Sequence, residues 1–268
     1  MTCALTLLGT GSSGGVPRLH ADGSPDWGAC DPHEPRNRRR RCSALATRQG
    51  PGGTTRVLID TSPDLRLQLL DARAGRLDAV LYTHNHADHI HGLDDLRLVV
   101  FASGGRLPLW ADAETAADLR VRFAYAFETP PGSPYTPICT LSHIDGPVTV
   151  QGPGGPLTFT PFEVEHGVIR ALGFRVGDLA YLPDVSAIPE AAWPALEGLC
   201  TLVVDALRYK PHPTHAHLDQ ALEWIVRARP RRAVVTNLHI DMDFATLARD
   251  LPPGVEPAHD GLILPFAP

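Results

Sequence analysis

One short segment of the chain is rich in histidine: Thr83-His84-Asn85-His86-Ala87-Asp88-His89 carries three imidazoles and one carboxylate. It directly follows residues 79–82, an apolar run that is typical of a short buried strand. A strand that ends in such a cluster directs the side chains to one edge of a sheet, where a metal ion can bind them. Neutral imidazole and carboxylate are ligands that Zn²⁺, Mn²⁺ or Fe²⁺ take in proteins. The segment therefore predicts a metal site at a sheet edge, with a histidine-rich surface loop as the alternative.

Strands and helices alternate along the chain. Apolar runs predict strands at residues 4–8, 56–59, 108–110, 156–164, 171–176, 179–182, 201–204 and 233–236. Periodicity and capping patterns predict helices at residues 62–73, 112–127, 218–228 and 244–251, with Ser62 and Asp112 as N-caps. Residues 129–147 are rich in Pro, Gly and Ser and predict a surface loop. Because no linker or repeat divides the chain, we expect one α/β domain spanning residues 1–268.

The composition narrows the class of protein. The chain has 268 residues and a formal net charge of −6, which argues against a broad surface for nucleic acid or anionic membranes. No signal peptide or stretch of transmembrane length is visible. The five cysteines are scattered along the chain: Cys3, Cys30, Cys42, Cys139 and Cys200. We expect a cytoplasmic protein whose thiols are free or bound to metal.

Three further residues of metal-ligand type follow apolar runs. They are His166 after residues 159–165, Asp184 after residues 181–183, and His239 after residues 234–236. Taken singly, each is equally consistent with a core histidine or a capping aspartate. Together with the first segment they favour one shared metal centre. Asp60 also ends a predicted strand, and we expect it to hydrogen-bond the loop that carries the ligands.

The order of these ligands resembles that of the metallo-β-lactamase-fold hydrolases: His84-x-His86-x-Asp88-His89, then His166, Asp184 and His239. Three more motifs are similar to the branch containing phosphoribosyl cyclic phosphate phosphodiesterase of the carbon–phosphorus lyase pathway: Gly9-Thr10-Gly11-Ser12-Ser13-Gly14-Gly15-Val16-Pro17, Trp27-Gly28-Ala29-Cys30 and Leu58-Ile59-Asp60. The resemblance implies a four-layer αβ/βα sandwich with a metal cleft at one sheet edge. It also implies two metal ions, one held by His84, His86 and His166 and the other by Asp88, His89 and His239, with Asp184 bridging them.

The chain departs from this family at one ligand. Members of the branch often place the last histidine directly after the strand's threonine, where this chain has Asn237. We expect His239 to bind the second ion, because imidazole is the stronger ligand for these metals. The alternative is the carbonyl oxygen of Asn237. The phosphodiesterase also has a cysteine-rich structural zinc site. This chain keeps only Cys30 and Cys42 of it, with Asp31 and His33 nearby, so the sequence does not decide whether a second zinc site is present.

A second group of histidines precedes the predicted helix at residues 218–228, in Pro211-His212-Pro213-Thr214-His215-Ala216-His217. By resemblance to the phosphodiesterase and to tRNA 3′-processing nucleases, His215 lies beside the metals and contacts phosphate or protonates the leaving oxygen. His217 is a further candidate for substrate binding, with a solvent-exposed side chain as the alternative. His212 is expected to position the loop.

Two motifs near the N-terminus lie outside the ligand pattern. Gly9, Gly11 and Gly14 match a dinucleotide-binding spacing, but Val16-Pro17 stands where a helix should begin, so we expect a tight turn beside the metal cleft. The run Arg38-Arg39-Arg40-Arg41 either steers a phosphate or forms a solvated strand start or a subunit contact.

The ligand set predicts hydrolytic chemistry. Two divalent ions would lower the pKa of a bridging water enough to give hydroxide at neutral pH, and would offset the charge on phosphate oxygens. With Asp88 and His215 as catalytic residues, we predict a dinuclear phosphodiesterase that hydrolyses a small or cyclic phosphodiester through metal-bound hydroxide. Zn²⁺ or Mn²⁺ is the expected metal, with Fe²⁺ as a further option.

Several alternatives remain open. Other hydrolases of the same fold are an RNA-processing nuclease, a thioesterase or a lactonase; a nuclease would need a long basic exosite, which is not visible. A different class is a cofactor protein of the pyrroloquinoline quinone biosynthesis type, which loss of ligands would favour. We expect a small phosphodiester as the partner, no membrane, and nucleic acid only as a short or nucleotide-sized substrate. The sequence leaves the oligomeric state undecided, with a homodimer as one option.

Overall fold

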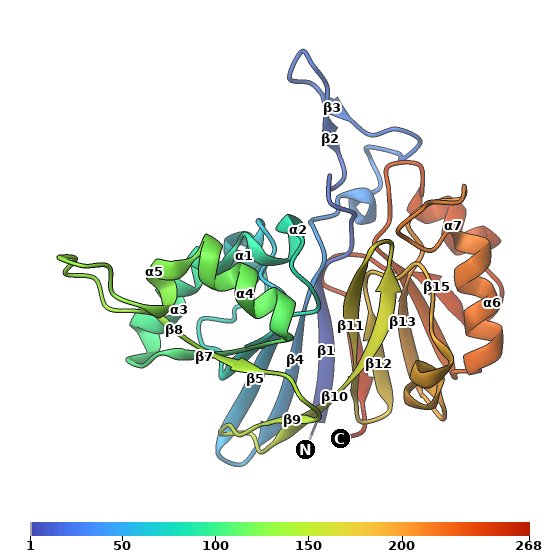
Figure 1. Ribbon diagram of the computed structural model, residues 1–268. Helices are drawn as coiled ribbons and strands as arrows, with labels where there is room; N and C mark the ends of the chain where they lie inside the picture. Colours follow the sequence, from blue (N-terminus) through green and yellow to red (C-terminus); the bar gives the residue numbers. More distant parts are fainter. Residues whose placement is uncertain (1) are drawn as a thin grey trace.

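The computed structural model describes residues 2–268. Two seven-stranded sheets lie face to face, and helices cover the outer face of each, so the chain has the expected αβ/βα sandwich architecture (Figure 1). A small hairpin of β2 (Arg18–Leu19) and β3 (Pro25–Asp26) projects from the body. Within residues 2–268, no helix has both the length and the apolar composition that a membrane crossing requires.

The first sheet has the strand order β16-β1-β4-β5-β6-β7-β8. Its strands are Ile263–Phe266, Thr2–Gly9, Ser43–Gly50, Gly53–Ile59, Ala79–Leu81, Leu107–Ala111 and Cys139–His143 in that order. The second sheet has the order β15-β14-β13-β12-β11-β10-β9. Its strands are Val255–Pro257, Arg232–Thr236, Thr201–Asp205, Leu179–Leu182, Ile169–Val176, Leu157–His166 and Val148–Val150.

The core between the sheets follows from the alternation of side chains along each strand. In β4, Ala44 and Ala46 face the second sheet, whereas Leu45 packs beneath the helices. The second sheet contributes Phe159 and Phe174, both fully buried, to the same layer. Burial of each large apolar side chain contributes about 1.5–3 kcal/mol, so this central layer fixes how the two sheets are placed relative to each other.

Helices complete the outer layers. The first sheet is covered by α1 (Leu65–Asp71), α2 (Ala87–Ile90), α3 (Leu96–Ser103), α4 (Ala113–Arg122) and α5 (Ala124–Phe127). The second sheet is covered by α6 (Leu218–Ala228), α7 (Phe244–Asp250) and the 3₁₀ helix η3 (Glu190–Leu196). Two shorter 3₁₀ helices are η1 (Pro35–Asn37) and η2 (Leu93–Asp95).

Beyond shifts of a few residues at element ends, three differences from the sequence prediction stand out. The first helix begins at Leu65, because the hydroxyl of Ser62 accepts only the Asp64 amide in a turn. Asp112 does cap α4 through the Thr115 amide, but the predicted single helix breaks at Phe123, whose backbone is not helical. The predicted loop at residues 129–147 contains β8, which pairs with β7 at the sheet edge.

The strand directions explain why functional residues gather at one edge. Strands β5 and β6 run parallel, as do β12, β13 and β14. Strand β10 has the same direction as β12, because each is antiparallel to β11 between them. The carboxyl ends of these strands therefore open at one edge of the sandwich, where both sheets can supply side chains to the same space.

Candidate metal centre

The strongest cluster of ligand atoms comes from both sheets. His84 and His86 follow β6, His166 ends β10, and Asp184 follows β12. One ligand atom from each of these four residues lies within 4.8 Å of all the others. His166 Nε2 is 3.1 Å from His86 Nδ1, and Asp184 Oδ2 is 3.6 Å from His166 Nε2 and 3.8 Å from His84 Nε2. The Nδ1–H of His166 donates to the backbone carbonyl of Thr214, which turns Nε2 toward the cluster.

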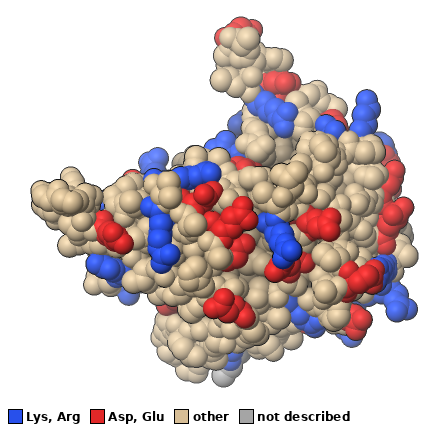
Figure 2. All heavy atoms as spheres, in the orientation of Figure 1, with Lys and Arg blue, Asp and Glu red and all other residues tan. Residues whose placement is uncertain are grey.

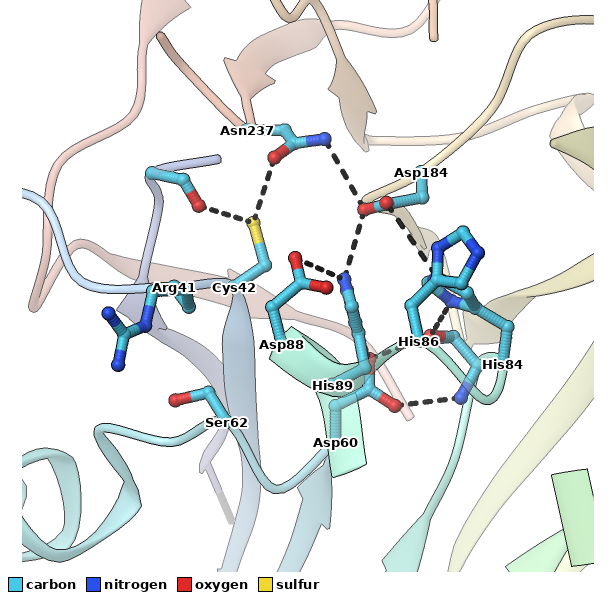
Figure 3. A network of polar contacts seen from close by, with 12 residues as sticks. Arg41, Cys42, Asp60, Ser62, His84, His86, Asp88, His89, Asp184 and Asn237 are labelled. Atoms are coloured by element: carbon cyan, nitrogen blue, oxygen red, sulfur yellow. Dashed lines mark hydrogen bonds and ion pairs between the residues drawn. The ribbon is translucent and has the colours of Figure 1, made fainter. Parts of the chain in front are cut away.

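Asp60 orients two of the histidines, as predicted. This buried carboxylate accepts hydrogen bonds from the amide and hydroxyl of Thr83, at 2.8 and 2.7 Å, and from His89 Nδ1 at 2.8 Å. Because the Thr83 hydroxyl donates to Asp60, its oxygen accepts from His84 Nδ1, 2.9 Å away. Both imidazoles are thereby held with Nε2 directed away from Asp60 (Figure 3).

These residues fit a divalent metal ion. The Nε2 atoms of His84 and His89 are buried and have no hydrogen-bond partner within residues 2–268. An unsatisfied buried polar atom costs about 1–3 kcal/mol, which a coordinated ion would recover. Burial lowers the pKa of His84 well below its ordinary value and that of His166 to about 4. Both rings are therefore neutral near pH 7, which is the form that binds metal.

A second group of possible metal ligands, more open to solvent, lies on the other side of Asp184. His89 Nε2 is 3.4 Å from Asp184 Oδ1 and 3.6 Å from Asp88 Oδ2. Although burial raises the pKa of Asp184, the neighbouring imidazole of His89 outweighs that effect and holds the pKa well below its usual range. Asp184 Oδ2 thus faces the first cluster, and Oδ1 faces Asp88 and His89 (Figure 3).

His239 and Asn237 occupy different places at this second position. The ring of His239 lines the same cavity as Asp88 and Asp184, and its Nδ1 pairs with Asp241 at 2.8 Å, which leaves Nε2 free for a ligand. Asn237 is buried directly after β14, and its Nδ2 is 3.3 Å from Asp184 Oδ1. The structure thus brings both side chains to the edge of the centre, with Asn237 in contact with Asp184.

His215 forms a pair with a carboxylate that sequence reasoning missed. His215 Nδ1 is 2.9 Å from Oδ2 of Asp205, the last residue of β13. Burial lowers the pKa of His215, but the hydrogen bond and charge of Asp205 raise it to about 9. The signal for Asp205 was present, because a carboxylate ends the apolar run Thr201–Asp205 much as Asp184 follows β12.

The cavity at this edge measures about 440 Å³, which lies within the range of roughly 300–1,000 Å³ that is typical of sites for small ligands. Its lining combines ligand residues with side chains that can contact a substrate. They are Ser12, Ser13, Arg18, His86, Asp88, Asp184, Leu207, Arg208, His212, His215 and His239. His217 is not among the lining residues and instead precedes α6 as its N-cap.

The arginine run makes structural contacts away from this cavity. Arg38 lies over the Trp27 ring, and Arg39 is buried and donates to the carbonyl of Met242. Arg40 and Arg41 form ion pairs with Asp71 and Asp64, at 2.7 and 2.9 Å. These contacts account for the run without a phosphate.

The two N-terminal cysteines have separate surroundings. Cys30 lies 3.8 Å from Arg39 Nη1, whereas Cys42 Sγ lies 3.9 Å from Asn237 Oδ1. Within residues 2–268, three or more ligand-type atoms converge at the His84 group and at no cysteine. At the glycine turn, a Cβ on Gly9 would stand 2.0 Å from the carbonyl oxygen of Arg41, so only glycine allows this close approach.

Comparison with known proteins places this geometry in a wider context. The model of the beta-lactamase superfamily domain matches residues 55–240. The crystal structure of a new diphosphatase from the PhnP family is 38% identical, with a TM-score of 0.86 over 99% of this chain and 98% of that one. Zn²⁺-bound PqqB from Methylobacterium extorquens shares the fold at 19% identity, with a TM-score of 0.73 over 97% of this chain and 99% of that one.

One curated protein is similar in sequence but much longer. It is an octanoyltransferase of Porphyromonas gingivalis (strain ATCC BAA-308 / W83), 33% identical over 259 residues, which are 96% of this chain and 50% of that protein. This chain therefore spans about half the length of that relative.

Proposed function

The chain belongs to the beta-lactamase superfamily, and on that basis we propose that it is a metal-dependent phosphodiesterase acting on a small or cyclic phosphodiester. One observation carries the proposal: the histidine–aspartate cluster and the His215–Asp205 pair open into the same cavity. The similarity to a diphosphatase over nearly the whole chain supports hydrolysis of a phosphate-containing substrate.

The ligands fall into two sets that share Asp184. In this proposal, His84, His86 and His166 hold one ion, and Asp88, His89 and His239 hold the other, with Zn²⁺ or Mn²⁺ as the metals. Divalent ions in such a site acidify a water molecule and neutralise charge on phosphate oxygens.

The remaining steps belong to side chains of the cavity. His215 carries a proton at neutral pH and donates it to the leaving oxygen, while Asp205 holds the ring in place. Asp88 has one oxygen near His89, so the other can orient the attacking water. Arg18 and Arg208 line the same cavity and have no carboxylate partner within residues 2–268, so they are available to phosphate oxygens.

The alternatives have weaker support. A nuclease needs an extended basic surface, but acidic and basic side chains are interspersed on the face shown in Figure 2. The octanoyltransferase is matched over only half its length, so acyl transfer is an outcome to be tested. Loss of ligands would favour a cofactor protein, yet His84, His86, His166 and Asp184 converge in this chain.

The deciding experiment loads the protein with Zn²⁺ or Mn²⁺ and compares three substrate classes: bis(p-nitrophenyl) phosphate, nucleoside cyclic phosphates and acyl thioesters. We expect hydrolysis of the phosphodiesters, and its loss in Asp184→Ala with the fold intact by circular dichroism. Turnover of thioesters alone would contradict the proposal. Elemental analysis should find about two ions per chain, and at most one ion at saturating metal would defeat the dinuclear arrangement.

A further inference from the structure

Asn237 stands where the second metal position meets Asp184. It follows the last residue of β14, is 2% exposed, and has a backbone φ of 62°, a left-handed conformation that asparagine tolerates better than most residues. Its Nδ2 lies 3.3 Å from Asp184 Oδ1 and 3.2 Å from Asp205 Oδ1. One amide group therefore donates to two buried carboxylates.

The two carboxylates fix the orientation of this amide. If the side chain were rotated to exchange Oδ1 and Nδ2, its oxygen would face the carboxylate of Asp184 without a proton between them, which is unfavourable in a buried site. In the observed orientation, Oδ1 points to the thiol of Cys42, 3.9 Å away (Figure 3). The oxygen of Asn237 is thus directed away from Asp184, and its N–H groups are directed toward it.

This contact falls on the oxygen that the second ion needs. Asp184 Oδ2 faces His84 and His166 of the first cluster, whereas Oδ1 faces His89 Nε2 at 3.4 Å. The Asn237 amide gives Oδ1 a partner in the absence of an ion, and its hydrogens carry positive partial charge that opposes a cation. On the side of the first cluster, no side-chain amide within residues 2–268 donates to Asp184 Oδ2, and the four ligand atoms already lie within 4.8 Å of one another.

We infer that Asn237 makes the two metal positions unequal, so that the ion at His84, His86, His166 and Asp184 binds tightly while the ion at Asp88, His89, His239 and Asp184 binds weakly and exchanges. The inference rests on the metal assignment of the proposed function. Because carboxylates form a larger share of the ligands at the weaker position than at the tighter one, the exchangeable ion should be the harder of the two, such as Mn²⁺.

Metal titration by calorimetry tests this without an activity assay. Apo protein titrated with Zn²⁺ or Mn²⁺ should bind two ions whose Kd values differ by at least about tenfold. Asn237→His adds an imidazole and should lower the second Kd by roughly 10- to 100-fold. Asn237→Gly removes the amide, suits the positive φ, and should leave the second ion bound at least as tightly as in the wild type.

A matched control is Cys42→Ser, which keeps a donor beside Asn237 Oδ1 and should leave both Kd values unchanged. Two ions of equal affinity in the wild type would overturn the inference. So would weaker binding of the second ion in Asn237→Gly, because that result would make Asn237 a ligand. Unequal Kd values in a protein that hydrolyses no phosphodiester would instead defeat the proposed function and leave this inference standing.

Discussion

Asp205 Oδ2 lies 2.9 Å from His215 Nδ1 and also accepts the Val185 amide at 3.1 Å. The second hydrogen bond fixes the carboxylate, and the carboxylate fixes the imidazole, so Nε2 is the atom that His215 presents to the cavity. Burial raises the pKa of Asp205 to about 7, and the pair as a whole retains a proton that His215 can deliver.

Replacement of His215 should separate acid catalysis from phosphate binding. If His215 protonates the leaving oxygen, His215→Ala should lower kcat by roughly 10²–10⁴-fold on substrates with poor leaving groups, with metal content unchanged. With p-nitrophenolate, which needs little protonation, the loss should be much smaller. Equal losses on both substrates, seen chiefly in KM, would show that the residue binds phosphate and does not act as an acid.

Asp205→Asn should move the pH profile. The carboxylate raises the pKa of His215, so its removal lowers that pKa and the protonated ring is lost at a lower pH. The alkaline limb of kcat on a substrate with a poor leaving group should therefore shift to lower pH. An unshifted limb, measured with the same metal content, would remove Asp205 from the proton-donating pair.

Asp60→Asn should weaken metal binding without removing a ligand. Asp60 accepts from His89 Nδ1 and from Thr83, and loss of its charge loosens the orientation of the His89 ring. We expect metal affinity to fall by roughly 10- to 100-fold in a chelator competition. Asp94→Asn, at an exposed carboxylate in η2, is the control that should bind metal normally.

Asp260 should make the stability of the fold depend on pH, and this effect does not involve the proposed metal centre. Burial raises its pKa from 3.8 to about 7, against the hydrogen bonds from the Arg40 amide and Thr10. The folded state holds a proton on Asp260 that the unfolded chain releases. The contribution of protonated Asp260 to the free energy of unfolding is therefore present below about pH 4 and is lost as pH rises through about 7. Over that range the free energy of unfolding of the wild type should fall by a few kcal/mol relative to that of Asp260→Asn, at about 1.4 kcal/mol per pKa unit.

Denaturant titrations in the presence of a chelator at several pH values measure this difference. A constant gap between wild type and Asp260→Asn from about pH 4 to 7 would show that Asp260 has an ordinary pKa in the folded protein.

Elements with strong local signals could be predicted from the sequence. Leu179–Leu182 and Leu218–Ala228 have the predicted bounds, because an apolar run and a helical period each decide the structure locally. Strand Ser43–Gly50 was not predicted, since its alanines and polar residues carry little strand preference. It forms because β1 and β5 pair with it on either side, a contact between segments that no local pattern contains.

The site divides in a similar way. His84 and His86 could be found by spacing alone, because they follow one strand. Asp205 was missed because its partner His215 belongs to a later loop, and only the fold brings the two together. His217 is close to His215 in sequence, yet it is the N-cap of α6 and does not line the cavity.

The proposed tight metal position takes His84 and His86 from the first sheet and His166 and Asp184 from the second. Neither sheet alone presents more than half of the set, so an ion stabilises only the state in which the two have docked. If docking comes after the folding transition state, saturating metal should slow unfolding while leaving the refolding rate of the apo chain almost unchanged. Metal uptake would then mark the last step of folding.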